Sequence, residues 1–223
     1  MPSKDFLSQL AIERLMTTSW GMTCLEESVE VVVFGSMSAG LERKDSDIDL
    51  LCFGTRIFTF KSGQLDLIGM HKETRESAIW LSSELASHIV AYGTWIRGSC
   101  AWAADVRIGD RAIEAKRHRI EAFIRALPHA WHSLDEIFRV KYSIKLRRET
   151  QRLILMEDGT PVPPTKVLDD FWDSVSRGPE DVQNRLYQFT ASSHESFNKD
   201  LLRRIDASFG TDRRAAHSSP VLA

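Results

Sequence analysis

The sequence lacks long apolar runs. Its longest apolar stretches, such as Val31–Phe34 and Leu50–Phe53, are far shorter than the roughly 18 residues of a membrane-spanning helix. The N-terminus mixes Lys4 with acidic residues and has no apolar region followed by a small-residue cleavage site, so a secretory signal is not expected. These absences predict a cytoplasmic protein with no membrane partner.

Cysteine is scarce. Cys24, Cys52 and Cys100 are odd in number and widely spaced, which is typical of neither a disulfide framework nor a zinc site. We expect them to be reduced and mostly buried. The remaining composition, 43% hydrophobic and 27% charged residues over 223 positions, is close to the globular average and predicts one or two compact domains.

An excess of charge of one sign is absent overall, because 29 Lys and Arg oppose 31 Asp and Glu. The distribution is uneven, however, and residues 107–152 carry 12 basic against 6 acidic side chains. Within this segment Lys141, Lys145 and Arg148 share one face of a predicted helix. This face predicts a contact with a triphosphate or pyrophosphate, and the alternative interpretation is a solvated basic surface.

The N-terminal part mixes helix and strand patterns. Amphipathic spacing predicts a helix over residues 5–18, which Gly21 ends, and apolar or alternating patterns predict strands over residues 29–34, 47–53, 56–60 and 65–70. The last two strands form a hairpin around Lys61-Ser62-Gly63. Residues 94–96 are predicted as an edge strand.

The C-terminal part is predicted to be helical. Helical patterns cover residues 73–91, 108–127, 132–156, 165–175 and 179–209, with a stiff loop at residues 158–164. The predicted fold class is therefore α+β, a mixed sheet flanked by helices followed by an all-helical domain. We expect the first domain at residues 1–105, the helical domain at 106–209 and a flexible tail at 210–223.

Two short motifs carry the chemistry. The apolar run Val31–Phe34 leads into Gly35-Ser36, and after ten further residues comes Asp47-Ile48-Asp49-Leu50. Alternate residues of a strand lie on one face about 6.5–7 Å apart, so Asp47 and Asp49 can approach the same cations. Carboxylate oxygens suit Mg²⁺, which usually completes its shell with waters and substrate phosphates. The spacing therefore allows the two carboxylates to hold metal ions together, although an isolated Asp-x-Asp pair is usually a solvated one.

This pattern resembles the nucleotidyltransferase superfamily that includes DNA polymerase beta. The resemblance covers residues 29–70, includes Gly40 between the two strands, and matches Asp66 to the third carboxylate of the family. The helical part after such a core is similar to the small-molecule nucleotidyltransferases that modify antibiotics. The resemblance implies Asp47, Asp49 and Asp66 as catalytic metal ligands for two Mg²⁺ ions, with an NTP, expected to be ATP, as co-substrate.

Gly35 and Ser36 are expected to bind the nucleotide. Glycine at a strand end lets backbone amides approach a triphosphate, and the Ser36 hydroxyl adds a donor. Many relatives carry a basic residue directly after the serine, whereas this sequence has Met37. The phosphate cation is then expected from Arg43, Lys44 or the basic helix with Lys141 and Lys145.

The reaction implied is metal-dependent transfer of a nucleoside monophosphate from an NTP to an acceptor hydroxyl, with release of pyrophosphate. The acceptor expected from the domain order is a small molecule, bound in a cleft between the two domains. One alternative is nucleotide transfer to a protein or an RNA such as tRNA, as in toxin-like members of the superfamily. Another is a non-catalytic nucleotide-binding protein with a regulatory role.

Overall fold

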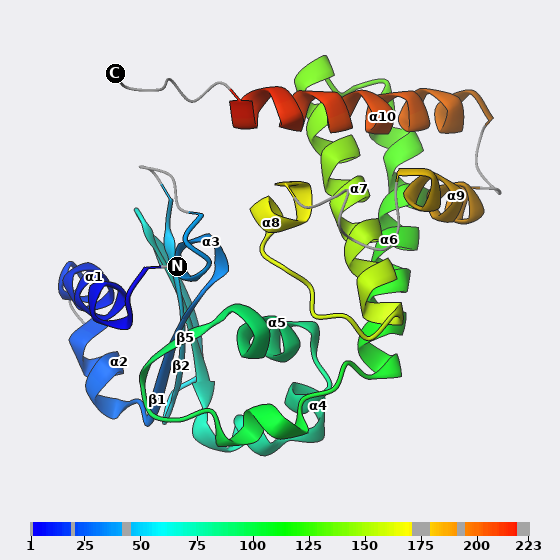
Figure 1. Ribbon diagram of the computed structural model, residues 1–223. Helices are drawn as coiled ribbons and strands as arrows, with labels where there is room; N and C mark the ends of the chain where they lie inside the picture. The colour runs from blue at the N-terminus through cyan, green and yellow to red at the C-terminus, as the bar shows by residue number, and fades with distance from the viewer. Residues whose placement is uncertain (1, 19–20, 42–45, 171–178, 191–194, 218–223) are drawn as a thin grey trace. The chain divides into compact units, whose positions relative to one another are not determined.

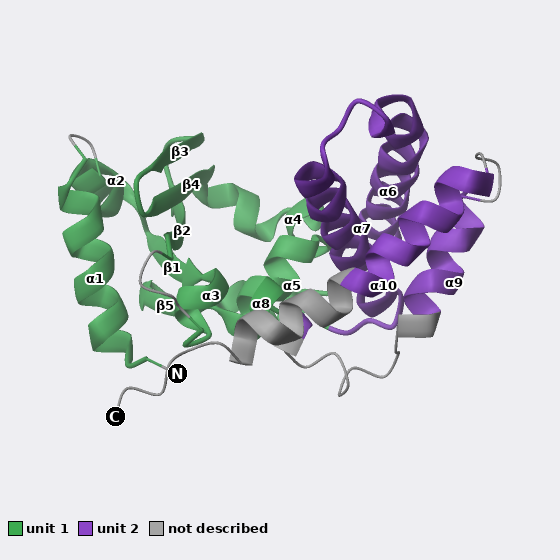
Figure 2. Ribbon diagram, turned by 90° about the horizontal axis from the view of Figure 1, so that it is seen from above, with its two compact units in different colours: residues 1–109, 161–167 green, residues 110–160, 168–223 purple. Residues whose placement is uncertain are grey.

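The computed structural model describes residues 2–18, 21–41, 46–170, 179–190 and 195–217. The chain divides into two compact units, which Figure 2 distinguishes by colour. Unit 1 comprises residues 1–109 and 161–167, and unit 2 comprises residues 110–160 and 168–223. Among the described residues, no helix is both long and apolar enough to cross a membrane.

Unit 1 is built on a five-stranded mixed sheet. Its strands are β1 (Glu30–Phe34), β2 (Ile48–Gly54), β3 (Phe58–Ser62), β4 (Leu65–His71) and β5 (Thr94–Arg97). They lie in the order β3-β4-β2-β1-β5, with β2 and β4 parallel and the other neighbours antiparallel. The strand predictions, including the hairpin and the edge strand, are confirmed within a few residues.

Helices cover both faces of this sheet. They are α1 (Lys4–Met16), α2 (Gly21–Glu27), α3 (Gly35–Ser38), α4 (Ala78–Leu81) and α5 (Glu84–Tyr92), with 3₁₀ turns η1 (Lys72–Glu76) and η2 (Ala101–Asp105). In Figure 1, α1 and α2 lie on one side of the strands, and α4 and α5 lie on the other. This is the α+β arrangement that the sequence predicts.

Alternation along the strands explains the two layers. Val31 and Val33 pack with Leu7 and Leu15 of α1, while Val32, between them, packs with α5 on the opposite face. Successive side chains of a strand point to opposite faces, so an unbroken apolar run fits a sheet that is covered on both sides. The run Val31–Phe34 therefore produces a central strand.

Two N-terminal helix boundaries differ from expectation. Gly21 begins α2 instead of ending the preceding helix. The helix predicted over residues 73–91 is divided into η1, α4 and α5, because Ser77 and Ser83 act as N-caps. Their hydroxyls accept hydrogen bonds from the backbone amides of Trp80 and Ala86. Capping serines favour a new helix start over continuation of the old one.

Unit 2 is helical. It contains α6 (Asp110–Trp131), α7 (Glu136–Glu157), α9 (Pro179–Thr190) and α10 (Glu195–His217), and α8 (Thr165–Asp170) runs into it from residues 161–167. Ile120, Leu146, Leu153, Leu186 and Leu201 are among the residues of its core. The sequence predicts one helix over 179–209, whereas α9 and α10 are separate helices and α10 continues to His217.

Residues 161–167 pack on unit 1 although they follow the long helix α7. Val162 is buried, and its carbonyl accepts a hydrogen bond from Nδ1 of His88 on α5 at 2.7 Å. The loop predicted at residues 158–164 is confirmed as non-helical. The second half of this loop has a structural role, because residues 161–167 return to the first unit and form part of it.

One buried charge organises the end of the sheet at the start of β1. Glu30 is completely buried, and its Oε1 accepts hydrogen bonds from the indole Nε1 of Trp95 at 2.6 Å and of Trp102 at 2.9 Å. Its Oε2 lies 3.5 Å from Nη1 of Arg75. A buried carboxylate is tolerated when such donors satisfy it.

We expect Glu30→Ala to lower the free energy of unfolding by about 3–5 kcal/mol, because it leaves two indole N–H groups and Arg75 without their partner. Urea unfolding followed by tryptophan fluorescence measures this loss. Glu26→Ala, at an exposed position of α2, is the matched control and should change stability by less than about 0.5 kcal/mol. Equal losses of stability in the two variants would contradict the stabilising role of the buried Glu30.

Candidate active site

Three carboxylates meet at one end of the central strands. Asp49 of β2 and Asp66 of β4 are direct partners in the parallel pairing, and Asp47 lies immediately before β2. One carboxylate oxygen from each of the three residues lies within 4.8 Å of those of the other two. All three side chains are half-buried. The structure thus brings together Asp47, Asp49 and Asp66, which we call the carboxylate triad.

The core of the sheet positions these acids. Ile48, Leu50 and Cys52 alternate with them and pack in the layer under α1. Asp49 shares the opposite face with Leu51 and Phe53, which belong to the layer under α4 and α5. The apolar residues therefore anchor β2 in the core, and the first side chain on the other face of the strand is the acidic Asp49.

Gly35 adjoins the triad and has two constraints. Its φ is +76°, in the left-handed region that favours glycine. A Cβ on Gly35 would also lie 2.2 Å from Oδ2 of Asp49, because Phe34 pairs with Asp49 in the β1–β2 ladder. Any side chain at this position would compete with the Asp49 carboxylate for space.

Residues 36–38 follow Gly35 in the short helix α3. Ser36 is half-buried, whereas Met37 is buried in the layer under α1. The Ser38 hydroxyl donates to the carbonyl of Tyr92 at 2.6 Å and lies 2.9 Å from the hydroxyl of Thr94. A basic side chain in place of Met37 would bring a charge into an apolar layer.

Lys61 contributes a positive charge to the triad. Its Nζ lies 2.9 Å from Oδ2 of Asp47 and 2.9 Å from Oδ2 of Asp66. The hydrogen bond from Lys61 lowers the pKa of Asp47, and the same two carboxylates raise the pKa of Lys61. The ammonium group therefore neutralises part of the negative charge of the cluster.

Asp49 has a different electrostatic environment. Burial raises its pKa to about 7, with further contributions from the negative charges of Asp47 and Asp66, and Lys61 only partly opposes this rise. Neither of the ion pairs of Lys61 involves Asp49. A carboxyl group that is forced to ionise next to two others is a natural partner for an added cation.

The sequence interpretation assigned Lys61 to the hairpin loop, which is wrong. β3 continues to Ser62, and Lys61 is the direct cross-strand partner of Asp66. The signal was present in the hairpin, because a tight turn at Gly63 pairs Ser62 with Leu65 and consequently Lys61 with Asp66. Opposite charges at directly paired positions attract each other.

The other predicted phosphate ligands lie outside the described residues or belong to unit 2. Lys44 and Arg43 lie outside the described residues. Lys141 and Lys145 are exposed on α7 of unit 2, and their ammonium groups each lie 5.5 Å from an aromatic ring, those of Phe138 and Phe123. Their contact with a nucleotide stays a prediction.

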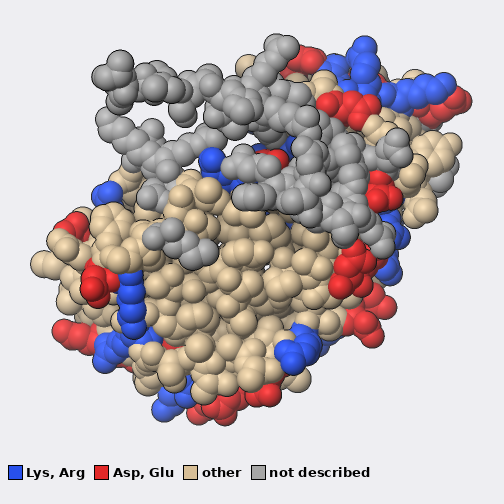
Figure 3. Space-filling model, viewed as in Figure 1, with Lys and Arg blue, Asp and Glu red and all other residues tan. Residues whose placement is uncertain are grey.

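Many cations of the basic segment are paired within unit 2. Arg147 and Arg148 both bind Asp169, at 2.9 and 2.5 Å, and Lys116 binds Glu149 at 2.7 Å. In the view of Figure 3, basic and acidic side chains likewise lie beside one another at the edge of the molecule. The excess of basic residues in the sequence therefore overstates the positive charge that is free to attract an anion.

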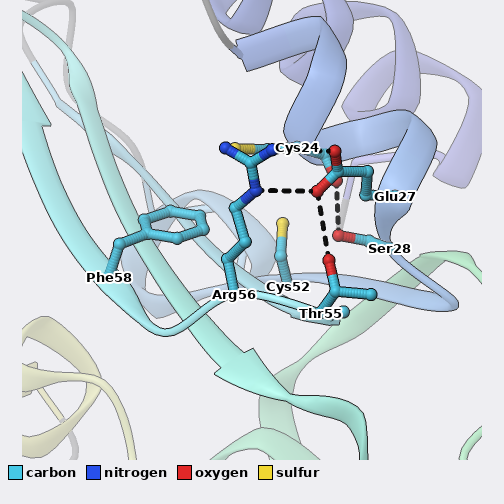
Figure 4. Close-up of a pocket in the computed structure, with 8 residues that line it drawn as sticks. Cys24, Glu27, Ser28, Cys52, Thr55, Arg56 and Phe58 are labelled. Carbon is cyan, nitrogen blue, oxygen red and sulfur yellow. Dashed lines mark hydrogen bonds and ion pairs between the residues drawn. The ribbon is translucent and has the colours of Figure 1, made fainter.

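The cysteines belong to a separate part of unit 1. Cys24 and Cys52 are buried and line a small pocket with Arg56 and Glu27, whereas Cys100 is exposed. Figure 4 shows Arg56 and Thr55 directed at Glu27, with an Arg56 Nε to Glu27 Oε2 distance of 3.0 Å. Burial raises the pKa of Cys52 to about 12, which keeps this thiol protonated and unreactive.

The family comparison agrees with this geometry. Residues 22–100 match the family model described as a nucleotidyltransferase domain. This segment is therefore similar to nucleotidyltransferase domains. It contains β1 to β5 up to Cys100, and hence the whole carboxylate triad, Gly35 and Lys61.

Comparisons with solved structures and with curated proteins give no stronger similarity. A solved structure described as a crystal structure of a toxin-antitoxin with AMP-PNP is 16% identical and matches 57% of this chain and 96% of its own, with a TM-score of 0.28. No curated protein matches the sequence.

We expect Gly35→Ala to lower the free energy of unfolding by about 1–2 kcal/mol, because alanine is strained at a positive φ. The methyl group should also displace the Asp49 carboxylate and weaken Mn²⁺ binding by the metal-free protein. Calorimetric titration with Mn²⁺ and urea unfolding measure the two effects. Gly63→Ala is the control, because that glycine also has a positive φ but nothing lies near its Cβ position. It should lose stability and keep Mn²⁺ affinity.

We expect Asp49→Asn to stabilise the metal-free protein at pH 8 by about 1–3 kcal/mol relative to wild type, and to have little effect at pH 4. The folded pKa of about 7 exceeds the unfolded value near 3.8. The folded wild type therefore binds this proton more tightly, and the stability that the proton provides is lost as the pH rises between these values. Urea unfolding in EDTA across this range tests the expectation.

Asp105→Asn, at an exposed position of the same unit, is the control for the removal of one carboxylate. Its stability should follow that of the wild type at every pH. If the stability of Asp49→Asn also followed that of the wild type at every pH, the raised pKa of Asp49 would be disproved.

Proposed function

We propose that this chain transfers a nucleoside monophosphate from an NTP to an acceptor hydroxyl and releases pyrophosphate. The observation that carries the proposal is the carboxylate triad, whose oxygens lie within 4.8 Å of one another inside the nucleotidyltransferase domain of residues 22–100. Sequence features beyond this domain contribute the expected acceptor class and the basic residues Lys141 and Lys145.

The donor set fits magnesium. Its three members are carboxylates, hard oxygen ligands of the kind that Mg²⁺ prefers, and an ammonium group already bridges two of them. We assign Asp47, Asp49 and Asp66 as the residues that hold two Mg²⁺ ions. Bound there, the ions supply charge neutralisation for the attacking and leaving oxygens of an in-line displacement.

The protein groups position the reactants. Gly35 presents a backbone without a side chain next to Asp49, which lets the triphosphate approach, and the Ser36 hydroxyl donates to a phosphate oxygen. Asp66 accepts the proton of the acceptor hydroxyl. The hydroxyl oxygen forms a bond to the α-phosphorus, and the bond from that phosphorus to pyrophosphate breaks with its electron pair leaving on pyrophosphate.

The substrates proposed are ATP and a small hydroxylated acceptor. Lys44, Lys141 and Lys145 are proposed to neutralise phosphate charge. The proposal for the helical residues depends on Lys141 and Lys145 more than on Arg148, which binds Asp169. The alternative acceptor is an RNA or a protein, and the transfer experiment below distinguishes it from a small molecule.

The decisive experiment incubates the protein with each α-labelled NTP and Mg²⁺, with three acceptor pools: hydroxylated small molecules, tRNA and the protein itself. We expect label from ATP to move to a small molecule with release of pyrophosphate. Asp49→Asn should lower this rate by about 100-fold or more, because a carboxylate ligand is lost. Asp105→Asn should retain the wild-type rate.

Other outcomes have distinct meanings. Label on tRNA or on protein would replace the acceptor and keep the reaction. Label on none of the pools, together with nucleotide binding, would support the non-catalytic alternative. Retained transfer by Asp49→Asn would refute the role of the triad.

A further inference from the structure

Lys61 and two members of the triad form a row of charges across the sheet. Lys61 pairs with Asp66 across β3 and β4, and Asp66 pairs with Asp49 across β4 and β2. The side chain of Lys61 then reaches both Asp66 and Asp47, with Nζ 2.9 Å from one oxygen of each. The ammonium group thus occupies one oxygen of each of two carboxylates that are proposed to hold the metal.

The same two carboxylates are poorly suited to hold Lys61 and a divalent cation together. Mg²⁺ binds carboxylate oxygens at about 2.1 Å, and an ammonium group hydrogen-bonded to the same carboxylates would lie within a few ångströms of it. Two positive charges at such a separation repel each other. The Lys61 contact must therefore break, or lengthen, when a metal enters.

Lys61 has the freedom to move. Its side chain is 64% exposed, and it lies on β3, the edge strand of the sheet, next to solvent. A lysine side chain is a flexible four-carbon stem with a compact charge that can change partners. Among the described residues, its ammonium group contacts two members of the triad, so one event releases both contacts together.

A triphosphate provides the natural new partner. Gly35, which is proposed to face the phosphates, adjoins Asp49, so the nucleotide would arrive beside the oxygens that Lys61 leaves. The residue directly after Ser36 is the buried Met37, which supplies no positive charge for the phosphates. Lys61 is a described cation close enough to the triad to take over this role.

We propose that Lys61 is an exchangeable counter-ion: it holds Asp47 and Asp66 before catalysis and moves to the phosphates when a metal–nucleotide complex binds. This inference rests on the proposed function and adds a regulation of its site. Free metal then binds weakly, because it must displace Lys61 without compensation. The metal–nucleotide complex binds well, because its phosphates accept the displaced ammonium.

The test measures binding and not turnover. Mn²⁺ affinity is determined by calorimetry at low salt, with and without a saturating non-hydrolysable ATP analogue, for wild type, Lys61→Met, Lys61→Arg and Lys72→Met. Mn²⁺ is a suitable probe because it prefers the same oxygen ligands as Mg²⁺. Lys72 is an exposed lysine of η1 in the same unit and controls for the loss of one charge.

We expect Lys61→Met to bind Mn²⁺ alone about 10-fold more tightly than wild type, since no ammonium has to be displaced. The enhancement of Mn²⁺ affinity by the analogue should fall by a similar factor, because the phosphates lose their lysine. Lys61→Arg should retain much of the wild-type coupling, and Lys72→Met all of it. Lys61→Gln serves as a second neutral variant that reports the same effect with a polar side chain.

Two results would overturn the exchange. Unchanged or weaker Mn²⁺ binding by Lys61→Met would show that Lys61 does not compete with the metal. Tighter Mn²⁺ binding with undiminished coupling to the analogue would show that it does not move to the phosphates. The proposed function fails separately: if wild type binds Mn²⁺ no better than Asp49→Asn does, the triad is not the metal site, and the exchange falls with it.

Discussion

The parallel pairing of β2 with β4 is the constraint on which the carboxylate triad depends. It places Asp49 opposite Asp66, and the buried neighbours Leu50 and Leu67 in the next register position keep that alignment. A shift of one residue would move Asp66 to the other face of the sheet, so the apolar layer specifies the register. The acids themselves repel one another. The core therefore supplies the free energy that holds the site together.

The β1–β2 ladder handles charge differently at its two ends. At one end, Glu30 is completely buried, its Oε1 accepts hydrogen bonds from two indole groups, and Arg75 lies 3.5 Å from its Oε2. At the other end, Asp49 is only half-buried, and the negative charges of Asp47 and Asp66 add to the effect of burial in raising its pKa. Donors stabilise a buried acid, whereas a carboxyl group beside like charges is a natural partner for a cation. The contrast agrees with a structural role for Glu30 and with the proposed metal-binding role of Asp49.

Much of the first unit follows from local pattern. The run Val31–Phe34 and the alternation around Asp49 predict their strands, because hydrophobic periodicity reflects burial directly. The strand spacing groups Asp47 with Asp49, and the family resemblance adds Asp66 as the third carboxylate. The role of Lys61 required the hairpin register, which depends on where the turn falls and not on composition. The packing of Val162 on His88 of unit 1 could not be foreseen, because it joins residues 74 positions apart through tertiary contact alone. Charge counting failed for a similar reason: the basic segment contains Arg147 and Arg148, whose shared partner Asp169 lies outside it.

Gly35 links the two halves of the proposed site. The absence of a side chain there leaves the space that Oδ2 of Asp49 occupies, and in the proposed function it also lets a phosphate approach. A change in the backbone at Gly35 would therefore alter the metal ligand and the phosphate-binding backbone at once. Lys61 produces the same coupling through charge, because it neutralises the triad from the opposite side, across β4. In the proposed function, a steric contact on one flank and an ionic contact on the other would make the metal and the nucleotide interdependent ligands, so each is expected to bind more tightly in the presence of the other.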